Sequence, residues 1–147
     1  MPGIMGHTYY QNYGHVTYHV NSVLLHTDDL PRVHAYMRAI LDRLGVRYTV
    51  VGGIEDHVHI LCDFPVNRAL SDIVRELKIS TTMWLKQHRA GYARFGWQGG
   101  FGYRSIGAER YLGVKGYIQH QRKHHADKTY EDEISEMRFC PIAFPNP

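Results

Sequence analysis

The chain has 147 residues, of which 44% are hydrophobic and 21% are charged. This composition is typical of one folded domain, and it excludes a disordered chain or two large independent domains. Because no apolar run could span a membrane and no secretion signal is recognisable, we expect a cytoplasmic protein with no membrane partner. Only two cysteines are present, Cys62 and Cys140, which excludes a disulfide scaffold and a zinc site made of Cys-x-x-Cys motifs.

The net charge of +3 conceals an uneven distribution of charge along the chain. Residues 66–128 hold twelve Lys and Arg against four Asp and Glu, whereas the remainder holds five against ten. Such a basic region favours a phosphate-facing surface, because neutralising backbone phosphates is the main source of non-specific affinity for nucleic acids. A solvated helix face would give the same excess, so the charge alone leaves both interpretations open.

Hydrophobic periodicity and turn residues predict seven elements in chain order. They are a strand at 15–26, a helix at 31–44, strands at 46–51 and 57–62, a helix at 67–85, a strand at 101–106 and a helix at 109–125. Asp28, Asp29 and Pro31 are typical of a helix start, and Gly45 is typical of a helix end. A Gly-Gly pair after the second strand predicts the turn of a hairpin with the third strand.

This order of elements predicts an α+β fold, the ferredoxin-like split βαβ sandwich, in which an antiparallel sheet has helices on one face. A C-terminal helix, the candidate catalytic helix, is added to that unit. We expect the domain to comprise residues 15–130, between an N-terminal arm at 1–14 and a C-terminal tail at 131–147. The third strand then lies inside the sheet, with one face under the helices and the other available for a ligand.

The third strand carries two histidines one residue apart, in the stretch DHVHILCDF. Because side chains alternate between the faces of a strand, His57 and His59 share one face while Val58 and Ile60 point to the other. An arbitrary His-x-His pair is more often two half-buried polar residues that are hydrogen-bonded to neighbours. Asp56 could orient a metal-bound histidine through its second ring nitrogen, or it could equally be a turn residue.

The last predicted helix places Tyr117 and Gln121 one above the other, while Val114 and Ile118 can pack onto the sheet. A helix docked in this way would bring a phenol and an amide oxygen over the histidine pair. Two imidazoles and an amide oxygen suit a divalent cation such as Mg²⁺ or Mn²⁺ that acts on a phosphate. A tyrosine has a pKa of about 10 and needs such help to act as a nucleophile at neutral pH. On spacing alone, Tyr117 is one of eleven tyrosines and could be an ordinary structural residue.

Four segments in register resemble the HUH endonucleases and, among them, the small single-tyrosine transposases that move insertion sequences as single-stranded DNA. The segments are DHVHIL at 56–61, LSDIVRELKISTTMWL at 70–85, FGWQGGFGYRSI at 95–106 and YIQHQRKHH at 117–125. The resemblance covers nearly the whole chain, from about residue 15 to 130. It implies that Tyr117 is the nucleophile and that His57, His59 and Gln121 are the metal ligands.

The resemblance further implies an enzyme that cleaves and rejoins single-stranded DNA by metal-assisted transesterification through a 5′-phosphotyrosine intermediate. It implies hairpin-forming DNA ends as substrate, homodimers whose active sites can be shared between subunits, and a location in the bacterial cytoplasm with the nucleoid. The cations expected to contact DNA are Arg75, Lys78, Lys86, Arg104, Arg122 and Lys123. Two alternatives stay open, namely a domesticated relative that nicks and rejoins genomic repeats and a catalytically silent ferredoxin-like module that binds nucleic acid.

Overall fold

The computed structural model describes residues 4–5 and 8–120. A four-stranded antiparallel sheet forms its centre, in the order β4-β5-β3-β6. The strands are β1 (Ile4–Met5), β2 (Thr8–Tyr9), β3 (Tyr13–His19), β4 (Arg47–Ile54), β5 (His57–Asp63) and β6 (Gly102–Ser105). The helices are α1 (Leu30–Arg43), α2 (Leu70–His88) and α3 (Tyr111–Gln119), with short 3₁₀ turns η1 (Thr27–Asp29), η2 (Ala90–Tyr92) and η3 (Ala108–Arg110). The predicted α+β ferredoxin-like fold is confirmed.

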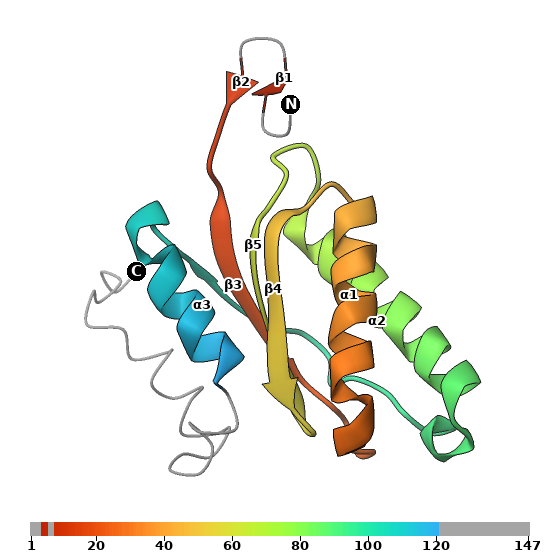
Figure 1. Ribbon diagram of the computed structural model, residues 1–147. Helices are drawn as coiled ribbons and strands as arrows, with labels where there is room; N and C mark the ends of the chain where they lie inside the picture. The colour runs from red at the N-terminus through yellow and green to blue at the C-terminus, as the bar shows by residue number, and fades with distance from the viewer. Residues whose placement is uncertain (1–3, 6–7, 121–147) are drawn as a thin grey trace, which may run out of the picture.

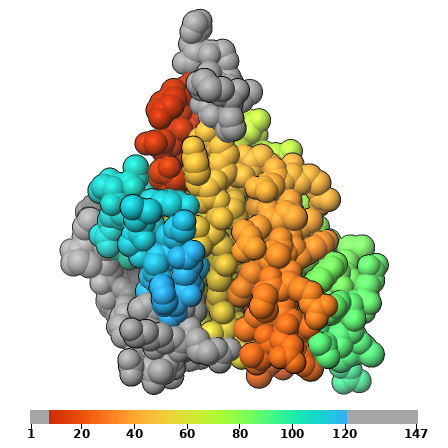
Figure 2. Space-filling model, in the orientation of Figure 1, coloured from red at the N-terminus to blue at the C-terminus, as the bar shows by residue number. Residues whose placement is uncertain are grey.

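The helices cover the two faces of the sheet unequally. Figure 1 shows α1 and α2 together on one side and α3 on the other, and Figure 2 shows β4 between α1 and α3. Val58, Ile60 and Cys62 of β5 belong to the large core under α1 and α2, whereas Leu61 packs with Ile118 of α3. The predicted alternation along β5 is therefore confirmed. Within the part of the chain described, none of the helices combines the length and apolar character of a membrane span.

Several boundaries differ from those predicted, most of them by a few residues. The first strand ends at His19, because the chain then leaves the sheet and its amide groups bond to the β4–β5 turn, Val20 N to Asp56 O and Leu25 N to Glu55 O. The predicted Gly-Gly turn is wrong, since both glycines belong to β4 and pair with β5. The last helix is seen to Gln119, and its predicted continuation to residue 125 lies outside the described residues.

A β-bulge interrupts the pairing of β4 with β5 between Arg47 and Val50. Within this bulge Tyr48 has a φ of 52°, the only positive φ of a non-glycine residue in the described ranges. A bulky side chain in the left-handed region costs roughly 1–3 kcal/mol. Tyr48 is nevertheless 61% exposed to solvent. The strained backbone thus directs an aromatic ring outward.

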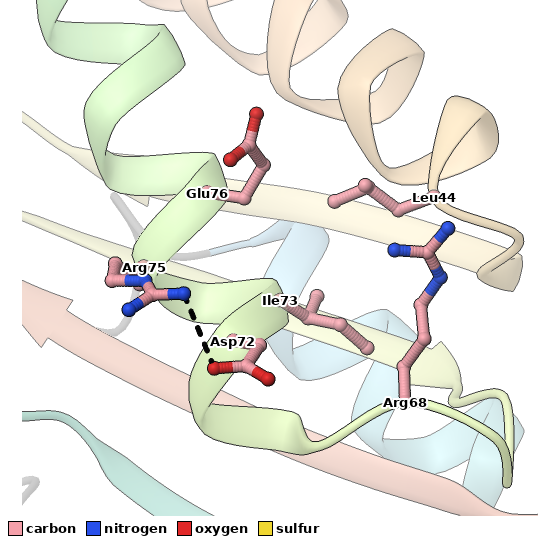
Figure 3. Close-up of a pocket in the computed structure, with 6 residues that line it drawn as sticks. All are labelled: Leu44, Arg68, Asp72, Ile73, Arg75 and Glu76. Atoms are coloured by element: carbon pink, nitrogen blue, oxygen red, sulfur yellow. Dashed lines mark ion pairs between the residues drawn. The ribbon is translucent and has the colours of Figure 1, made fainter.

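A groove lies between the end of α1 and the start of α2, on the face of the sheet away from α3. Figure 3 shows Arg68 below Leu44 and the ion pair between Arg75 and Asp72. The pair spans 3.4 Å between side chains that are 72% and 64% exposed, so solvent screens it strongly. The groove combines cations with carboxylates and has no buried polar side chain directed into it that would indicate a ligand.

The buried carboxylate of Asp29 joins the start of α1 to the end of α2. Arg89 donates to both of its oxygens, at 3.0 Å from Nε and 2.9 Å from Nη2, and Tyr92 Oη donates at 2.7 Å. The hydrogen bonds from Arg89 hold the pKa of Asp29 well below its ordinary value, although burial opposes this effect. A folded-state pKa below the unfolded value stabilises the fold at neutral pH.

We expect Asp29→Asn to lower the free energy of unfolding at neutral pH by about 2 kcal/mol, because the bidentate ion pair is lost. The contribution of the carboxylate is complete above its unfolded pKa of about 3.9 and disappears as the pH falls toward the lower folded value. Urea unfolding should therefore show that the difference in free energy of unfolding between wild type and Asp29→Asn is present at pH 7 and becomes smaller below pH 4. Asp28→Asn, at an exposed neighbour, is the matched control. A difference in free energy of unfolding that does not change with pH would contradict a stabilising role of the ionised Asp29 carboxylate.

Candidate active site

The candidate active site forms where α3 covers β5. His57 and His59 point to this face and are both fully buried, with ring centroids 4.9 Å apart. Tyr117 approaches from α3, and its ring meets that of His59 edge-on at a centroid distance of 5.7 Å. The structure thus brings together three of the four residues predicted for the nucleophile and the metal site. Gln121 lies outside the described residues.

Both histidines use Nδ1 in a short hydrogen bond. Nδ1 of His57 lies 2.7 Å from Oδ1 of Asp56, and Nδ1 of His59 lies 2.8 Å from Nε2 of His15. Metal-binding histidines are held in this way by a partner on the second ring nitrogen, which fixes the tautomer and the ring orientation. Each ring would therefore coordinate a metal through Nε2.

The donor set fits a divalent cation, because two oriented imidazoles share one buried face. Among residues 4–5 and 8–120, no cluster of three histidine, cysteine or carboxylate side chains has the arrangement of a metal site. The predicted third ligand is of another type, the amide of Gln121. The chemistry of the described donors is thus compatible with the predicted set.

The sequence interpretation missed the contribution of β3. His15, Thr17 and His19 alternate along this strand and share the face of the histidine pair. His15 is 5% exposed, and its ring lies 6.5 Å from that of Tyr117, edge-on. His19 Nε2 lies 3.7 Å from the second carboxylate oxygen of Asp56. The signal was present in the stretch HVTYH, whose polar residues recur with a period of two.

A glycine allows α3 to lie close to the sheet. Gly52 of β4 is the register partner of His59, and it lies directly beneath Ile118. A Cβ atom at this position would be 2.5 Å from the carbonyl oxygen of Ile118 and 2.7 Å from its Cγ2. Only a residue without a side chain fits there. The position of Tyr117, next to Ile118 in the helix, therefore depends on Gly52.

The predicted DNA-contacting cations are divided between the two faces. Arg104 of β6 lies directly opposite His15 in the register and so shares the face of the histidine pair. Arg75 and Lys86 are exposed on α2, on the opposite side of the sheet. Arg122 and Lys123 lie outside the described residues. Of the four cations described, only Arg104 is close to the candidate active site.

Lys78, also on α2, has a structural role. Its ammonium group donates to the carbonyl oxygens of Gln98 at 2.9 Å and Gly100 at 2.6 Å, and it lies 5.0 Å from the ring centroid of Tyr18. Burial lowers the pKa of Lys78. These contacts anchor the loop before β6 to α2.

A tyrosine-bearing helix over a His-x-His strand of an antiparallel sheet is the arrangement expected from the resemblance to HUH-type transposases with a single tyrosine. The model of the IS200-like transposase family matches residues 8–121, and the chain belongs to this family. None of the curated proteins compared with the sequence matches it.

Two solved structures have a similar fold. One is a Deinococcus radiodurans R1 protein assigned as a transposase, with 16% identity, a TM-score of 0.62, and coverage of 82% of this chain and 98% of that one. The other is a REP-associated tyrosine transposase bound to a REP hairpin, with 14% identity, a TM-score of 0.54, and coverage of 97% and 93%. At these identities the likeness concerns the fold alone.

We expect Gly52→Ala to displace α3 from the sheet, because the added methyl group would overlap the backbone of Ile118. Overpacking of this kind costs about 1–3 kcal/mol. Hydrogen exchange read by mass spectrometry should be faster in α3 and unchanged in β3 and β5. The control is Gly113→Ala, where a Cβ has open space and should favour the helix. Equal exchange of α3 in wild type and Gly52→Ala would contradict this role of the glycine.

Proposed function

We propose that this transposase cleaves and rejoins single-stranded DNA through Tyr117. The observation that carries the proposal is the contact between the phenol ring of Tyr117 and the imidazole of His59, at a centroid distance of 5.7 Å. A module that only binds nucleic acid has no need to bring a tyrosine onto a buried pair of oriented histidines. The membership in a transposase family supports the same interpretation.

The proposed reaction is a transesterification. The phenol oxygen of Tyr117 forms a bond to phosphorus, the bond to the 3′ oxygen breaks, and the phenol proton ends on the released 3′ hydroxyl. The 5′ phosphate is then held as a phosphotyrosine ester, from which a second 3′ hydroxyl can reform the DNA bond. No nucleotide cofactor is required, because an ester is exchanged for an ester.

The surrounding residues prepare this site for a phosphate. His57 and His59, together with the amide of Gln121, would hold Mg²⁺ or Mn²⁺, which would supply charge neutralisation at the scissile phosphate. Asp56 and His15 orient the two imidazoles through their Nδ1 atoms. Arg104 adds a cationic side chain to the same face of the sheet.

We further propose that the substrate is a single strand with hairpin-forming ends and that the protein acts as a homodimer. The cis contact between Tyr117 and His59 supports a site in which each subunit uses its own tyrosine. Three of the expected DNA contacts lie on α2, across the sheet, namely Arg75, Lys78 and Lys86. Arg75 and Lys86 would contact a distant part of a folded substrate there, and Lys78 would act through the loop that it anchors. Arg122 and Lys123 would contact DNA beyond the end of α3.

A second candidate is a domesticated relative that nicks and rejoins genomic repeats. A REP-associated tyrosine transposase bound to a REP hairpin has a similar fold, so the fold is compatible with this variant of the same chemistry. Both candidates need the same nucleophile, and they differ in whether the gene is flanked by ends that it mobilises.

We expect wild type with Mn²⁺ and labelled single-stranded oligonucleotides to form an adduct that resists denaturant, and we expect Tyr117→Phe to form none. The phenylalanine keeps the ring contact with His59 but lacks the attacking oxygen, so DNA binding should persist. Denaturing gel electrophoresis detects the adduct. Tyr36→Phe, on α1 at the other face, should behave as wild type. Robust cleavage by Tyr117→Phe would exclude this nucleophile and favour attack by water.

We expect His15→Phe to weaken Mn²⁺ binding by about 10–100-fold, because the ring is retained but the hydrogen bond that orients His59 is lost. Titration calorimetry with Mn²⁺ alone measures this effect independently of DNA cleavage. The control is His26→Phe, at an exposed histidine beside Tyr92. If His15→Phe binds Mn²⁺ as tightly as wild type, His15 does not orient a metal ligand.

A further inference from the structure

Tyrosine rings gather around one arginine at the start of α3. This group, here called the tyrosine platform, consists of Tyr10, Tyr13, Tyr48 and Tyr111 with the guanidinium of Arg47. The ring centroid of Tyr13 lies 5.1 Å from that of Tyr111 and 6.4 Å from that of Tyr48. Cζ of Arg47 lies 4.9 Å from the ring centroid of Tyr10 and 5.8 Å from that of Tyr48. Tyr111 also packs against the hydrophobic cluster under α3, whereas Tyr48 belongs to neither hydrophobic cluster and has no part in the proposed chemistry.

The platform is continuous with the candidate active site. Tyr13 precedes His15 by two residues on β3, so both side chains are on the face that α3 covers. Tyr111 precedes Tyr117 by six residues on α3, which corresponds to about 9 Å along the helix axis. A short stretch of single strand that leaves the active site along α3 would therefore reach the platform.

Tyr48 is the member of the platform that is presented to solvent. It is 61% exposed although its backbone is held at a φ of 52°. The carbonyl oxygen of Tyr48 accepts a hydrogen bond from Tyr111 Oη at 2.9 Å, which secures the bulge from α3. Strained residues that persist in a fold cluster at functional sites. Beyond its contacts with Tyr13 and Arg47, most of the Tyr48 side chain is left open to solvent.

The charge of the platform favours aromatic stacking over phosphate binding. Arg47 is paired with the buried carboxylate of Asp63, so its cation is already balanced. What remains for a ligand is the ring surface. The two tryptophans are packed elsewhere, Trp97 edge-on against Tyr18 and Phe95, and Trp84 against the core under α1 and α2.

We propose that the tyrosine platform binds unpaired bases of the single-stranded substrate by stacking, with the ring of Tyr48 as the exposed contact. Aromatic side chains hold single strands in this way without a preference for sequence, because every base has an aromatic face. This inference rests on the proposed function. It adds that unpaired bases of the substrate are bound next to the candidate active site.

The test uses Tyr48→Gly in the full chain. Glycine suits the positive φ and keeps the carbonyl oxygen that Tyr111 bonds, so the variant should fold with an equal or higher melting temperature. Its affinity for an oligothymidylate, measured by fluorescence anisotropy, should fall roughly tenfold or more. A ring that serves only the fold gives the opposite result, a lower melting temperature with unchanged affinity.

A second probe identifies the base as the ligand. Wild type should bind oligothymidylate more tightly than an abasic oligonucleotide of the same length, and Tyr48→Gly should reduce that preference. The matched control is Tyr103→Ala, at a ring 41% exposed that lies over Gly14 on the other face of the sheet and should leave the preference unchanged. If wild type and Tyr48→Gly prefer oligothymidylate over the abasic oligonucleotide to the same extent, the proposed stacking on the platform is wrong.

The adduct assay separates this inference from the proposed function. If wild type forms the Tyr117 adduct while Tyr48→Gly binds both oligonucleotides as wild type does, the platform is wrong and the chemistry stands. If wild type forms no adduct but Tyr48→Gly reduces the preference for bases, the platform is supported in a protein that binds DNA without cleaving it. Loss of affinity by Tyr103→Ala equal to that of Tyr48→Gly would also overturn the platform.

Discussion

The close contact of α3 with the sheet is the constraint on which the site depends. Ile118 lies against Gly52, and this contact sets the height of the neighbouring Tyr117 above the histidines of β5. Tyr117 and the histidines come from elements far apart in the sequence, so no local interaction can bring them together. The geometry rests on one residue in β4 that has no side chain and on the apolar residues that hold α3 in place.

Local periodicity was sufficient to predict much of the fold and part of the site. The histidine pair could be assigned to one face because the side-chain period of a strand is two, and Ile118 to the sheet-facing side because of helical spacing. His15 was missed because its partner His59 is 44 residues away and only the register of β3 with β5 joins them. The Gly-Gly pair predicts a turn, but Gly52 serves close helix packing instead, and both roles favour glycine.

The cations of α2, Arg75, Lys78 and Lys86, illustrate a second limit of sequence reasoning. Periodicity identifies which side of a helix is polar, but not which face of the sheet the helix covers. Arg75 and Lys86 therefore lie across the sheet from the histidines, whereas Arg104, from a short strand, lies beside them. Tyr48 escaped notice for a related reason, since a bulge breaks the period on which the interpretation was based.

The two faces of the sheet are held by very different amounts of apolar packing. The side under α1 and α2 has a large core, with the buried Asp29 carboxylate at one end. In the described part of the chain, α3 packs a smaller cluster, in which its Ile118 is buried against Val50 and Leu61 with partly buried side chains around them. Complete burial of one such side chain contributes on the order of 2–3 kcal/mol. Because no residue of α3 belongs to the large core, moving Tyr117 away from His57 and His59 would leave that core in place. The scaffold and the helix that carries Tyr117 are thus held by separate sets of apolar contacts.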